Sequence, residues 1–252
     1  MSKIISVHSF RGGTGKSNTS ANLAYLCAVQ GLKVGVVDTD IQSPGIHVLF
    51  GMDEESMENG KSLNDYLWGK CAIEETAHDV TASLGASVKG KVFLIPSSIK
   101  AGEIARVLRE GYDVGLLNDG FDALVKNLGL DMLIIDTHPG LNEETLLSIA
   151  ISDTLVLIMR PDQQDYQGTS VTVEVARKLD VPQMLLMVNK VPEKLMAAVK
   201  QNVEATYNCE VAAVIPHSDD LMTLASSGIF SQKYPDHSVT KIYQQLANRI
   251  MD

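Results

Sequence analysis

The sequence predicts an α/β protein with a three-layer, doubly wound and mostly parallel sheet. Short apolar runs rich in β-branched residues alternate with segments of helical periodicity along the chain. The runs are continuously apolar rather than alternating, which is typical of parallel strands covered by helices on both faces. The chain has 252 residues, 45% of them hydrophobic, which suffices for one full core. We therefore expect residues 1–252 to form a single domain.

The strands are predicted from the apolar runs, most of which end at a polar residue or a proline. In chain order they are Ile4–Ser9, Lys33–Asp38, Val92–Pro96, Met132–Asp136, Thr154–Met159, Met184–Asn189 and Val211–Pro216. Apolar residues at helical spacing predict helices at Ser17–Gln30, Leu63–Trp68, Gly102–Leu128, Asn142–Ile151, Gly168–Leu179 and Val239–Met251. The acidic segment Asp53–Lys61 is predicted to be a solvated surface loop.

Composition excludes several classes of protein. The net charge of -10 means that the chain as a whole repels phosphate backbones and anionic lipid, so any DNA binding must be local or conditional. The three cysteines form no CxxC pair, and the six histidines show no metal-ligand spacing, so we expect structural histidines and a reducing cytoplasm. No leader and no apolar run of about 18 residues is seen, so we expect neither export nor a membrane span.

A glycine-rich loop follows the first predicted strand and leads directly into a helix. Its glycines let several backbone N–H groups converge on an anion, and the helix adds the positive end of its dipole. Lys16 would reach the β- and γ-phosphates of a nucleotide, and the Ser17 hydroxyl would bind Mg²⁺. The alternative is a simple glycine-rich turn. The predicted nucleotide contacts here are Arg11, Gly12, Gly13, Thr14, Gly15, Lys16, Ser17 and Asn18.

Acidic residues end two other predicted strands. Asp38 and Asp40 follow the second strand, and Asp136 ends the strand that begins at Met132. Ligands of an open parallel sheet bind beyond the carboxyl ends of its strands, so these carboxylates are expected to face the phosphate loop. The alternative for Asp38 and Asp40 is a solvated turn.

These motifs resemble those of the ParA/MinD family of deviant-Walker P-loop ATPases, whose loop reads KGGxGK[ST]. Arg11 stands where that family has a lysine that reaches the phosphates of a partner subunit. The resemblance implies ATP and Mg²⁺ as cofactors and a catalytic Arg11 that acts in trans like an arginine finger. A contact within the same chain, or a solvated side chain, is the alternative for Arg11.

The resemblance extends to the other motifs. It implies that Asp40 is catalytic and orients the attacking water, and that Asp38 helps to hold the Mg²⁺ water shell, although the division between the two stays open. The Walker B acid would be Asp136, followed by a switch motif in which His138 replaces a proline. Two residues beside the base, Asn189 and Pro216, would bind adenine.

The function implied is that of a slow ATPase that acts as a timing switch. ATP would drive formation of a homodimer that binds non-specific nucleoid DNA, and a cargo adaptor protein would stimulate hydrolysis. The last predicted helix has only two basic residues, Lys241 and Arg249, so no membrane partner is expected. The loop is similar to that of the cyanobacterial carboxysome-positioning members, and plasmid or chromosome partition is the alternative.

Two rival functions remain open. One is a non-hydrolysing, ATP-dependent adaptor, in which Arg11 replaces a catalytic lysine. The other is a metal-carrier relative of the same fold, which would need paired cysteines near the dimer axis. The wide spacing of Cys27, Cys71 and Cys209 argues against the second.

Overall fold

The computed structural model describes residues 2–252, which form one eight-stranded sheet in the order β3-β4-β2-β5-β1-β6-β7-β8. All neighbouring pairs are parallel except β3 with β4. The predicted α/β fold with a mostly parallel sheet is confirmed. The strands are β1 (Lys3–His8), β2 (Lys33–Asp38), β3 (His78–Asp79), β4 (Lys91–Ile95), β5 (Met132–Asp136), β6 (Thr154–Met159), β7 (Gln183–Val191) and β8 (Glu210–Pro216).

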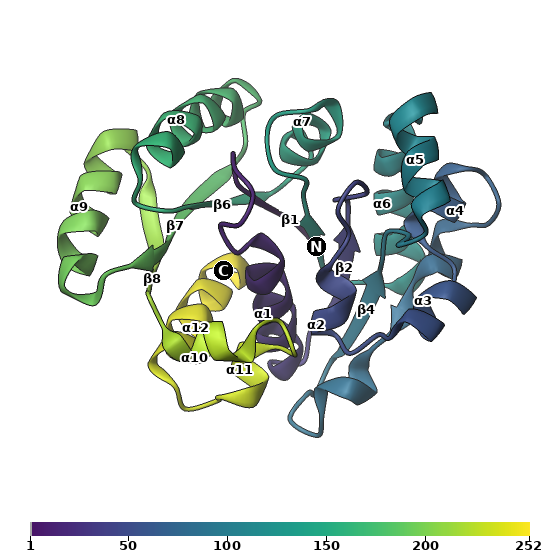
Figure 1. Cartoon of the computed structure of the whole chain (residues 1–252), viewed down its shortest axis with the longest axis horizontal. Helices are drawn as coiled ribbons and strands as arrows, with labels where there is room; N and C mark the ends of the chain where they lie inside the picture. The colour runs from purple at the N-terminus through teal and green to yellow at the C-terminus, as the bar shows by residue number, and fades with distance from the viewer. Residues whose placement is uncertain (1) are drawn as a thin grey trace.

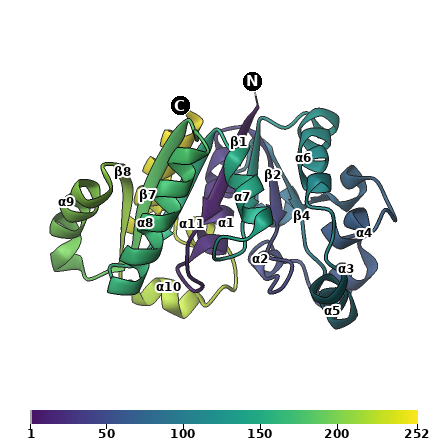
Figure 2. The ribbon, with the colours of Figure 1, turned by 90° about the horizontal axis from the view of Figure 1, so that it is seen from above.

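Helices cover both faces of the sheet. Figure 1 shows α1, α11 and α12 on one side and α7 and α8 on the other, and Figure 2 shows α7 and α8 in front with α1 behind. Short 3₁₀ helices lie at Ile73–Thr76, Thr81–Leu84 and Glu193–Leu195. The α-helices are α1 (Lys16–Val29), α2 (Ile46–Leu49), α3 (Glu54–Asn59), α4 (Leu63–Leu67), α5 (Ala101–Glu110), α6 (Gly115–Leu128), α7 (Glu143–Ala150), α8 (Gln163–Lys178), α9 (Met196–Tyr207), α10 (Asp219–Leu224), α11 (Phe230–Lys233) and α12 (Ser238–Met251).

The core is divided by the sheet because successive strand side chains point to opposite faces. In β2, Val34 and Val36 pack with α1 and α12, whereas Val37 packs with α4 and α6. In β6, Val156 joins the first group and Leu157 packs with α8 and α9. Both faces of the central strands are therefore apolar, which explains their continuous hydrophobic runs.

The central strands bring distant segments of sequence to one edge. Strand β5 lies between β1 and β2, with Asp136 paired in register to Asp38 on one side and to Val7 on the other. The loops that follow these three strands consequently leave the sheet side by side. This edge is where a ligand of an open α/β sheet binds.

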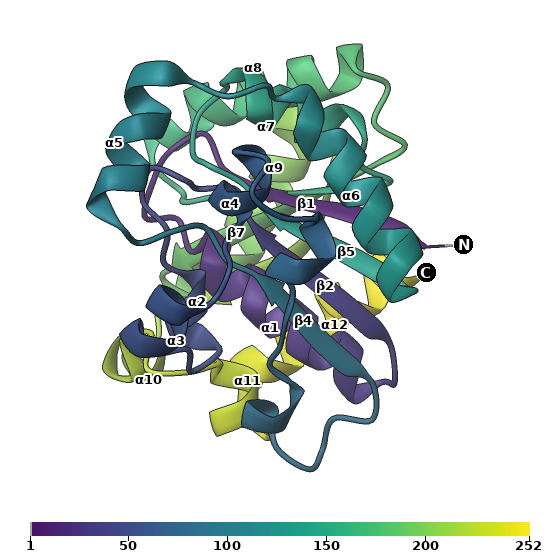
Figure 3. The ribbon, with the colours of Figure 1, turned by 90° about the vertical axis from the view of Figure 1, so that its right-hand side faces the viewer.

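The opposite edge carries the start of β1 and the end of α12. The ammonium of Lys3 donates to the carbonyl oxygens of Ile250 and Met251, at 3.4 and 3.1 Å. Figure 3 shows this edge at the right, away from α2 and α10 at the left. As expected, α12 buries its apolar face, against α1 and β8, and its buried residues include Tyr243 and Leu246. Within residues 2–252, no helix is both long enough and apolar enough to cross a membrane.

Two predicted elements were wrong in detail. The segment Asp53–Lys61 contains helix α3 rather than only a loop, because the Asp53 carboxylate caps it by accepting from Ser56 N at 2.9 Å. The long helix predicted at Gly102–Leu128 is broken into α5 and α6. Gly111 ends α5 with a φ of 66°, which directs the chain out of the helix.

Two further boundaries differ from prediction. Helix α8 begins at Gln163 rather than Gly168, capped by the Asp162 side chain. Strand β7 continues to Val191, past Asn189, with an irregular pairing to β8 at this point.

Candidate phosphate-binding site

The loop between β1 and α1 has the backbone of an anion cradle. Gly13 and Gly15 have φ angles of 75° and 104°, in the left-handed region that favours glycine. Gly15 is the N-cap residue of α1 and provides no side-chain cap, so the first amides of the helix stay available to a ligand. A Cβ atom at Gly15 would lie 2.6 Å from Nδ2 of Asn189. The predicted phosphate loop is thus built on backbone that other residues would not adopt.

Lys16 is buried at the base of this loop, with 7% of its surface exposed. Its ammonium donates to Ser9 Oγ at 3.3 Å, and Ser9 Oγ in turn donates to the carbonyl of Arg11 at 2.6 Å. Burial lowers the pKa of Lys16, while the charges of Asp136, Asp40 and Asp38 raise it. A buried ammonium with one neutral acceptor has donors to spare, and phosphate oxygens would satisfy them.

Asp38 and Asp136 lie side by side behind the loop. Asp136 accepts from Ser20 Oγ at 2.8 Å, and burial raises its pKa to about 6 against hydrogen bonds from Ser17 and Ser20. Burial and the Asp136 charge raise the pKa of Asp38 well above its usual range. The Asp38 oxygens accept from the backbone of Asp40 and Gly45, at 3.0 and 3.3 Å. Asp38 therefore organises the loop after β2.

Asp40 is the carboxylate that faces the phosphate cavity, which has a volume of about 450 Å³. Burial raises the pKa of Asp40, and the His138 ring, when it is protonated, and the Lys16 ammonium oppose this. Its Oδ1 lies 3.7 Å from Nε2 of His138, which also lines the cavity. Lining residues from the loops after β1, β2 and β5 include Gly12, Gly13, Gly15, Lys16, Ser17, Asn18, Asp40, Ser43, Gly45, His138 and Pro139.

The sequence predicts only a structural role for His138, as for the other histidines. The spacing of the histidines contained no signal to the contrary, because only the folded loop after β5 brings this ring to Asp40. Its position directly after a strand-terminal acid, Asp136, was the one available hint.

The residues present fit a Mg²⁺ ion held partly by a nucleotide. Among residues 2–252, no three His, Cys, Asp or Glu side chains converge to form a metal cage. Mg²⁺ keeps several waters and commonly uses only one or two carboxylates together with substrate phosphates. The Ser17 hydroxyl lines the cavity and hydrogen-bonds to Asp136, so an all-oxygen set lies beside the predicted phosphates.

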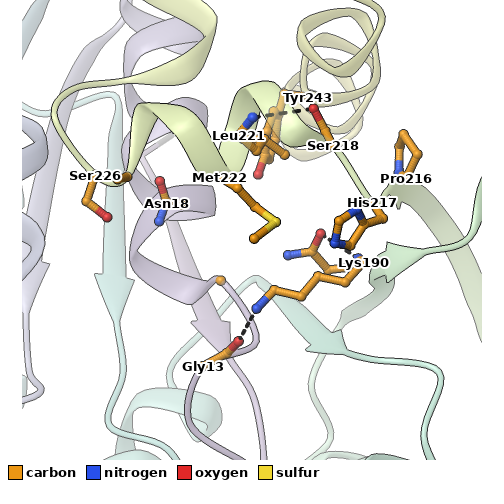
Figure 4. A pocket seen from close by; sticks show the side chains of 13 residues that line it. Gly13, Asn18, Lys190, Pro216, His217, Ser218, Leu221, Met222, Ser226 and Tyr243 are labelled. Carbon is orange, nitrogen blue, oxygen red and sulfur yellow. Dashed lines mark hydrogen bonds between the residues drawn. The ribbon is translucent and has the colours of Figure 1, made fainter.

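A second cavity of about 420 Å³ adjoins the loop and has the mixed lining expected for a base (Figure 4). The predicted Asn18, Asn189 and Pro216 all line it. Met222 of α10 points toward its centre, and Tyr243 of α12 forms part of its wall. The sequence did not mark these last two residues, because α10 and α12 reach the cavity only through the tertiary fold.

Asn189 ties the base cavity to the phosphate loop. Its Nδ2 donates to the carbonyl of Thr14 at 2.7 Å, and its Oδ1 accepts from the Lys190 amide at 2.8 Å. Lys190 has a φ of 60°, and its ammonium donates to Gly13 O at 3.1 Å (Figure 4). The irregular pairing of β7 with β8 thus directs the side chains of Asn189 and Lys190 toward the phosphate loop. One hydrogen and one lone pair of the Asn189 amide remain free, as adenine recognition would require. That recognition stays a prediction.

Arg11 contacts its own chain. Its Nη1 lies 3.4 Å from Asp162 Oδ1 and 3.3 Å from Asp165 Oδ1, at the start of α8. The preceding residue, Phe10, packs its ring against Gly168 of the same helix. This is the contact within one chain that the sequence left as an alternative, and action in trans stays a prediction.

Comparison with known proteins agrees with this architecture. The AAA domain family matches residues 2–183. An uncharacterized ATP-binding protein of Methanocaldococcus jannaschii is 25% identical over 252 residues, covering 100% of this chain and 88% of that protein. The septum site-determining protein MinD of Pyrococcus horikoshii, solved with Mg-ADP, has a TM-score of 0.78 at 21% identity and covers 99% of this chain and 96% of its own. A Cyanothece McdA–ATP complex has a TM-score of 0.77 at 18% identity, with the same coverage.

Proposed function

Because the chain belongs to the AAA domain family, as a ParA/MinD-type deviant-Walker ATPase that uses ATP and Mg²⁺, we propose that it is a slow switch that positions an intracellular cargo. In this proposal ATP drives a homodimer, the dimer binds non-specific DNA of the nucleoid, and a cargo adaptor stimulates hydrolysis and release. Carboxysomes are the cargo that we favour, with plasmid or chromosome partition as the alternative.

The observation that carries the proposal is that Lys16, Asp40 and Ser17 line one cavity beside the uncapped start of α1. The loop amides and Lys16 would bind the β- and γ-phosphates and stabilise the charge that develops during transfer. Asp40 would orient the attacking water. A bound Mg²⁺ supplies charge neutralisation at the phosphate oxygens, and Ser17 with Asp136 and Asp38 would hold it and its water shell.

The switching part of the proposal is supported by the loops after β2 and β5. Both bring side chains into the phosphate cavity, so the presence of a γ-phosphate would change their contacts. The net charge of -10 makes DNA binding by an isolated chain unfavourable. A dimer that brings basic side chains together on one face would make that binding depend on ATP. The resemblance of the phosphate loop to carboxysome-positioning members supports the choice of cargo.

The test measures binding to non-specific duplex DNA with no nucleotide, with ADP and with ATP, while light scattering records the mass. Asp40→Ala serves to slow hydrolysis. We expect a dimer with ATP alone, and DNA affinity of that dimer that falls steeply with salt. An ATP dimer that ignores DNA would contradict the nucleoid matrix and favour another surface.

One observation favours a non-hydrolysing adaptor as a second candidate. Arg11 is held by Asp162 and Asp165 of its own chain and so is withdrawn from a partner's phosphates. Phosphate release assayed with DNA and candidate partners separates an adaptor from a slow enzyme. Metal analysis of the purified protein tests the metal-carrier alternative, whose paired cysteines have no counterpart here. Cys27 is buried in α1, whereas Cys71 and Cys209 follow α4 and α9.

A further inference from the structure

His138 occupies a position in the phosphate cavity that the mechanism above does not use. It lies in the loop after β5, two residues beyond Asp136, with 22% of its side chain exposed. The cavity also contains Lys16 and Asp40, the ammonium and the carboxylate assigned to the reaction. A histidine that shares a cavity with Lys16 and Asp40 can contact a reacting group directly.

Hydrogen bonds to its backbone hold the loop around His138 in place. Thr145 Oγ1 donates to the His138 carbonyl at 3.4 Å, and the Gly140 amide donates to Ser9 O at 3.3 Å. Immediately before it, Thr137 N donates to Val7 O at 3.2 Å. These bonds attach the loop to both β1 and α7, so the ring has a defined place before any ligand binds.

The hydrogen bond of the ring fixes which nitrogen can accept. Nδ1 of His138 lies 2.6 Å from the carbonyl oxygen of Pro139, which can only accept, so Nδ1 carries the hydrogen. In the neutral ring, Nε2 then keeps its lone pair. This nitrogen lies 3.7 Å from Oδ1 of Asp40. Two acceptors therefore stand close together at the cavity.

A water that attacks phosphorus must be oriented by two hydrogen-bond acceptors. Its lone pair must be directed at the γ-phosphorus while both of its hydrogens point away, which takes two acceptors at one site. Asp40 Oδ1 and His138 Nε2 are near enough for one water to donate a hydrogen bond to each. A carboxylate alone would hold one hydrogen and leave the water free to rotate.

We propose that His138 is a further catalytic residue that, together with Asp40, holds the attacking water in line with the γ-phosphate. This inference rests on the ATPase function. The new oxygen–phosphorus bond forms as the bond from phosphorus to the bridging oxygen breaks, and that electron pair stays on ADP. One water proton remains on the released phosphate, and the other leaves to solvent.

The test compares His138→Leu, which has no acceptor, with His138→Gln, which keeps one. We expect His138→Leu to lower kcat by about 10²-fold with KM changed less than about twofold, because the water loses its orientation. His138→Gln should recover most of the lost rate. Unchanged kcat in His138→Leu, or a Gln variant no better than the Leu variant, would overturn the proposal.

Binding measurements provide a readout apart from turnover. Both variants should bind fluorescent ADP like the wild type, whereas His138→Leu should bind ADP with aluminium fluoride, a mimic of the transferring phosphoryl group, about 10²-fold more weakly. Equal affinities of wild type and His138→Leu for that complex would also overturn the proposal. A wild-type protein that binds ADP but releases no phosphate would contradict the ATPase function itself, and the fluoride affinities would still decide the role of His138.

Discussion

The guanidinium of Arg11 lies 3.3 Å from a carboxylate oxygen of Asp165, a side chain that is only 3% exposed. The same carboxylate accepts from the backbone and the side chain of Arg160, at 2.8 and 3.1 Å. Arg160 would therefore keep Asp165 neutralised if Arg11 moved away. The contact holds Arg11 in the monomer, but its loss would not leave a buried charge unpaired.

Replacing Arg11 tests whether it leaves this contact to act across a dimer. Arg11→Ala should cost less than about 1 kcal/mol in stability, since the side chain is partly exposed. If Arg11 acts in trans, the substitution should lower ATP turnover about 10³-fold, as loss of an arginine finger does, and weaken the proposed ATP-dependent dimer. Phosphate release and light scattering measure the two effects, with Arg11→Lys as the control that keeps the charge. Unchanged turnover and dimerisation in Arg11→Ala would show that the arginine has no role in trans.

Gly15→Ala should abolish nucleotide binding in a protein that otherwise folds. The residue has a φ of 104°, and its Cβ would lie 2.6 Å from Asn189, so the loop must change shape. Gly12→Ala is the matched control, because its nearest neighbour would be 4.0 Å away and its φ is not in the left-handed region. Titration with fluorescent ADP compares the two. Equal affinities in both variants would mean that the loop adapts to a side chain.

Gly168→Ala should destabilise the protein through Phe10. A Cβ at Gly168 would lie 2.1 Å from the Phe10 ring, which overpacks the contact at a cost of about 1–3 kcal/mol. In a Phe10→Gly background, which also removes the Phe10 Cβ that would lie 2.8 Å away, the same change should be neutral or stabilising, because alanine favours a helix by about 1 kcal/mol over glycine. Urea unfolding of the four proteins completes the cycle. Additive effects would show that the two residues do not interact.

His8 should make stability depend on pH. Burial above all, with the charge of Lys16 and that of His138 when protonated, lowers its pKa from 6.5 to about 3. The unfolded chain therefore takes up a proton below pH 6.5 that the folded protein refuses. This contribution to stability is complete above pH 6.5 and is lost progressively as the pH falls toward 3.

The comparison that isolates this effect uses His8→Asn, which can still reach Thr137, the partner of His8 Nδ1 at 2.7 Å. Between pH 7.5 and 5 the wild type should lose about 2 kcal/mol relative to the variant. Urea unfolding of both without Mg²⁺ measures the difference, and the contributions of the buried aspartates cancel in it. A difference that stays constant with pH would mean that His8 is not buried as a neutral ring.

The parts of the fold that the sequence predicted best are those governed by burial alone. The bounds of β2, β5 and β6 match the prediction to the residue, because strands covered on both faces are continuously apolar until a polar residue ends them. Helix α8 was predicted to start five residues late. Its first turn contains no apolar periodicity, and the Asp162 cap was the only local signal.

In the candidate site too, residues in local motifs were predictable from the sequence, whereas contacts that depend on the tertiary fold were not. The meeting of the glycine-rich loop with Asp40 and Asp136 was predictable, because short contiguous motifs at the ends of three strands mark these residues. Their roles toward a nucleotide stay predictions. The contribution of Met222 and the contact of Arg11 with Asp165 were not predictable, because each depends on helices that pack from elsewhere in the chain. Those contacts become visible only when the sheet order is known.

The base cavity also bears on how the protein is made. One of its walls includes Gly13, and another includes Tyr243, from opposite ends of the sequence. During synthesis the phosphate loop leaves the ribosome long before α12 does, so a nascent chain has no finished cavity in which to hold a base. We therefore expect ATP capture to begin only after translation of α12, which would keep unfinished chains out of the proposed dimer.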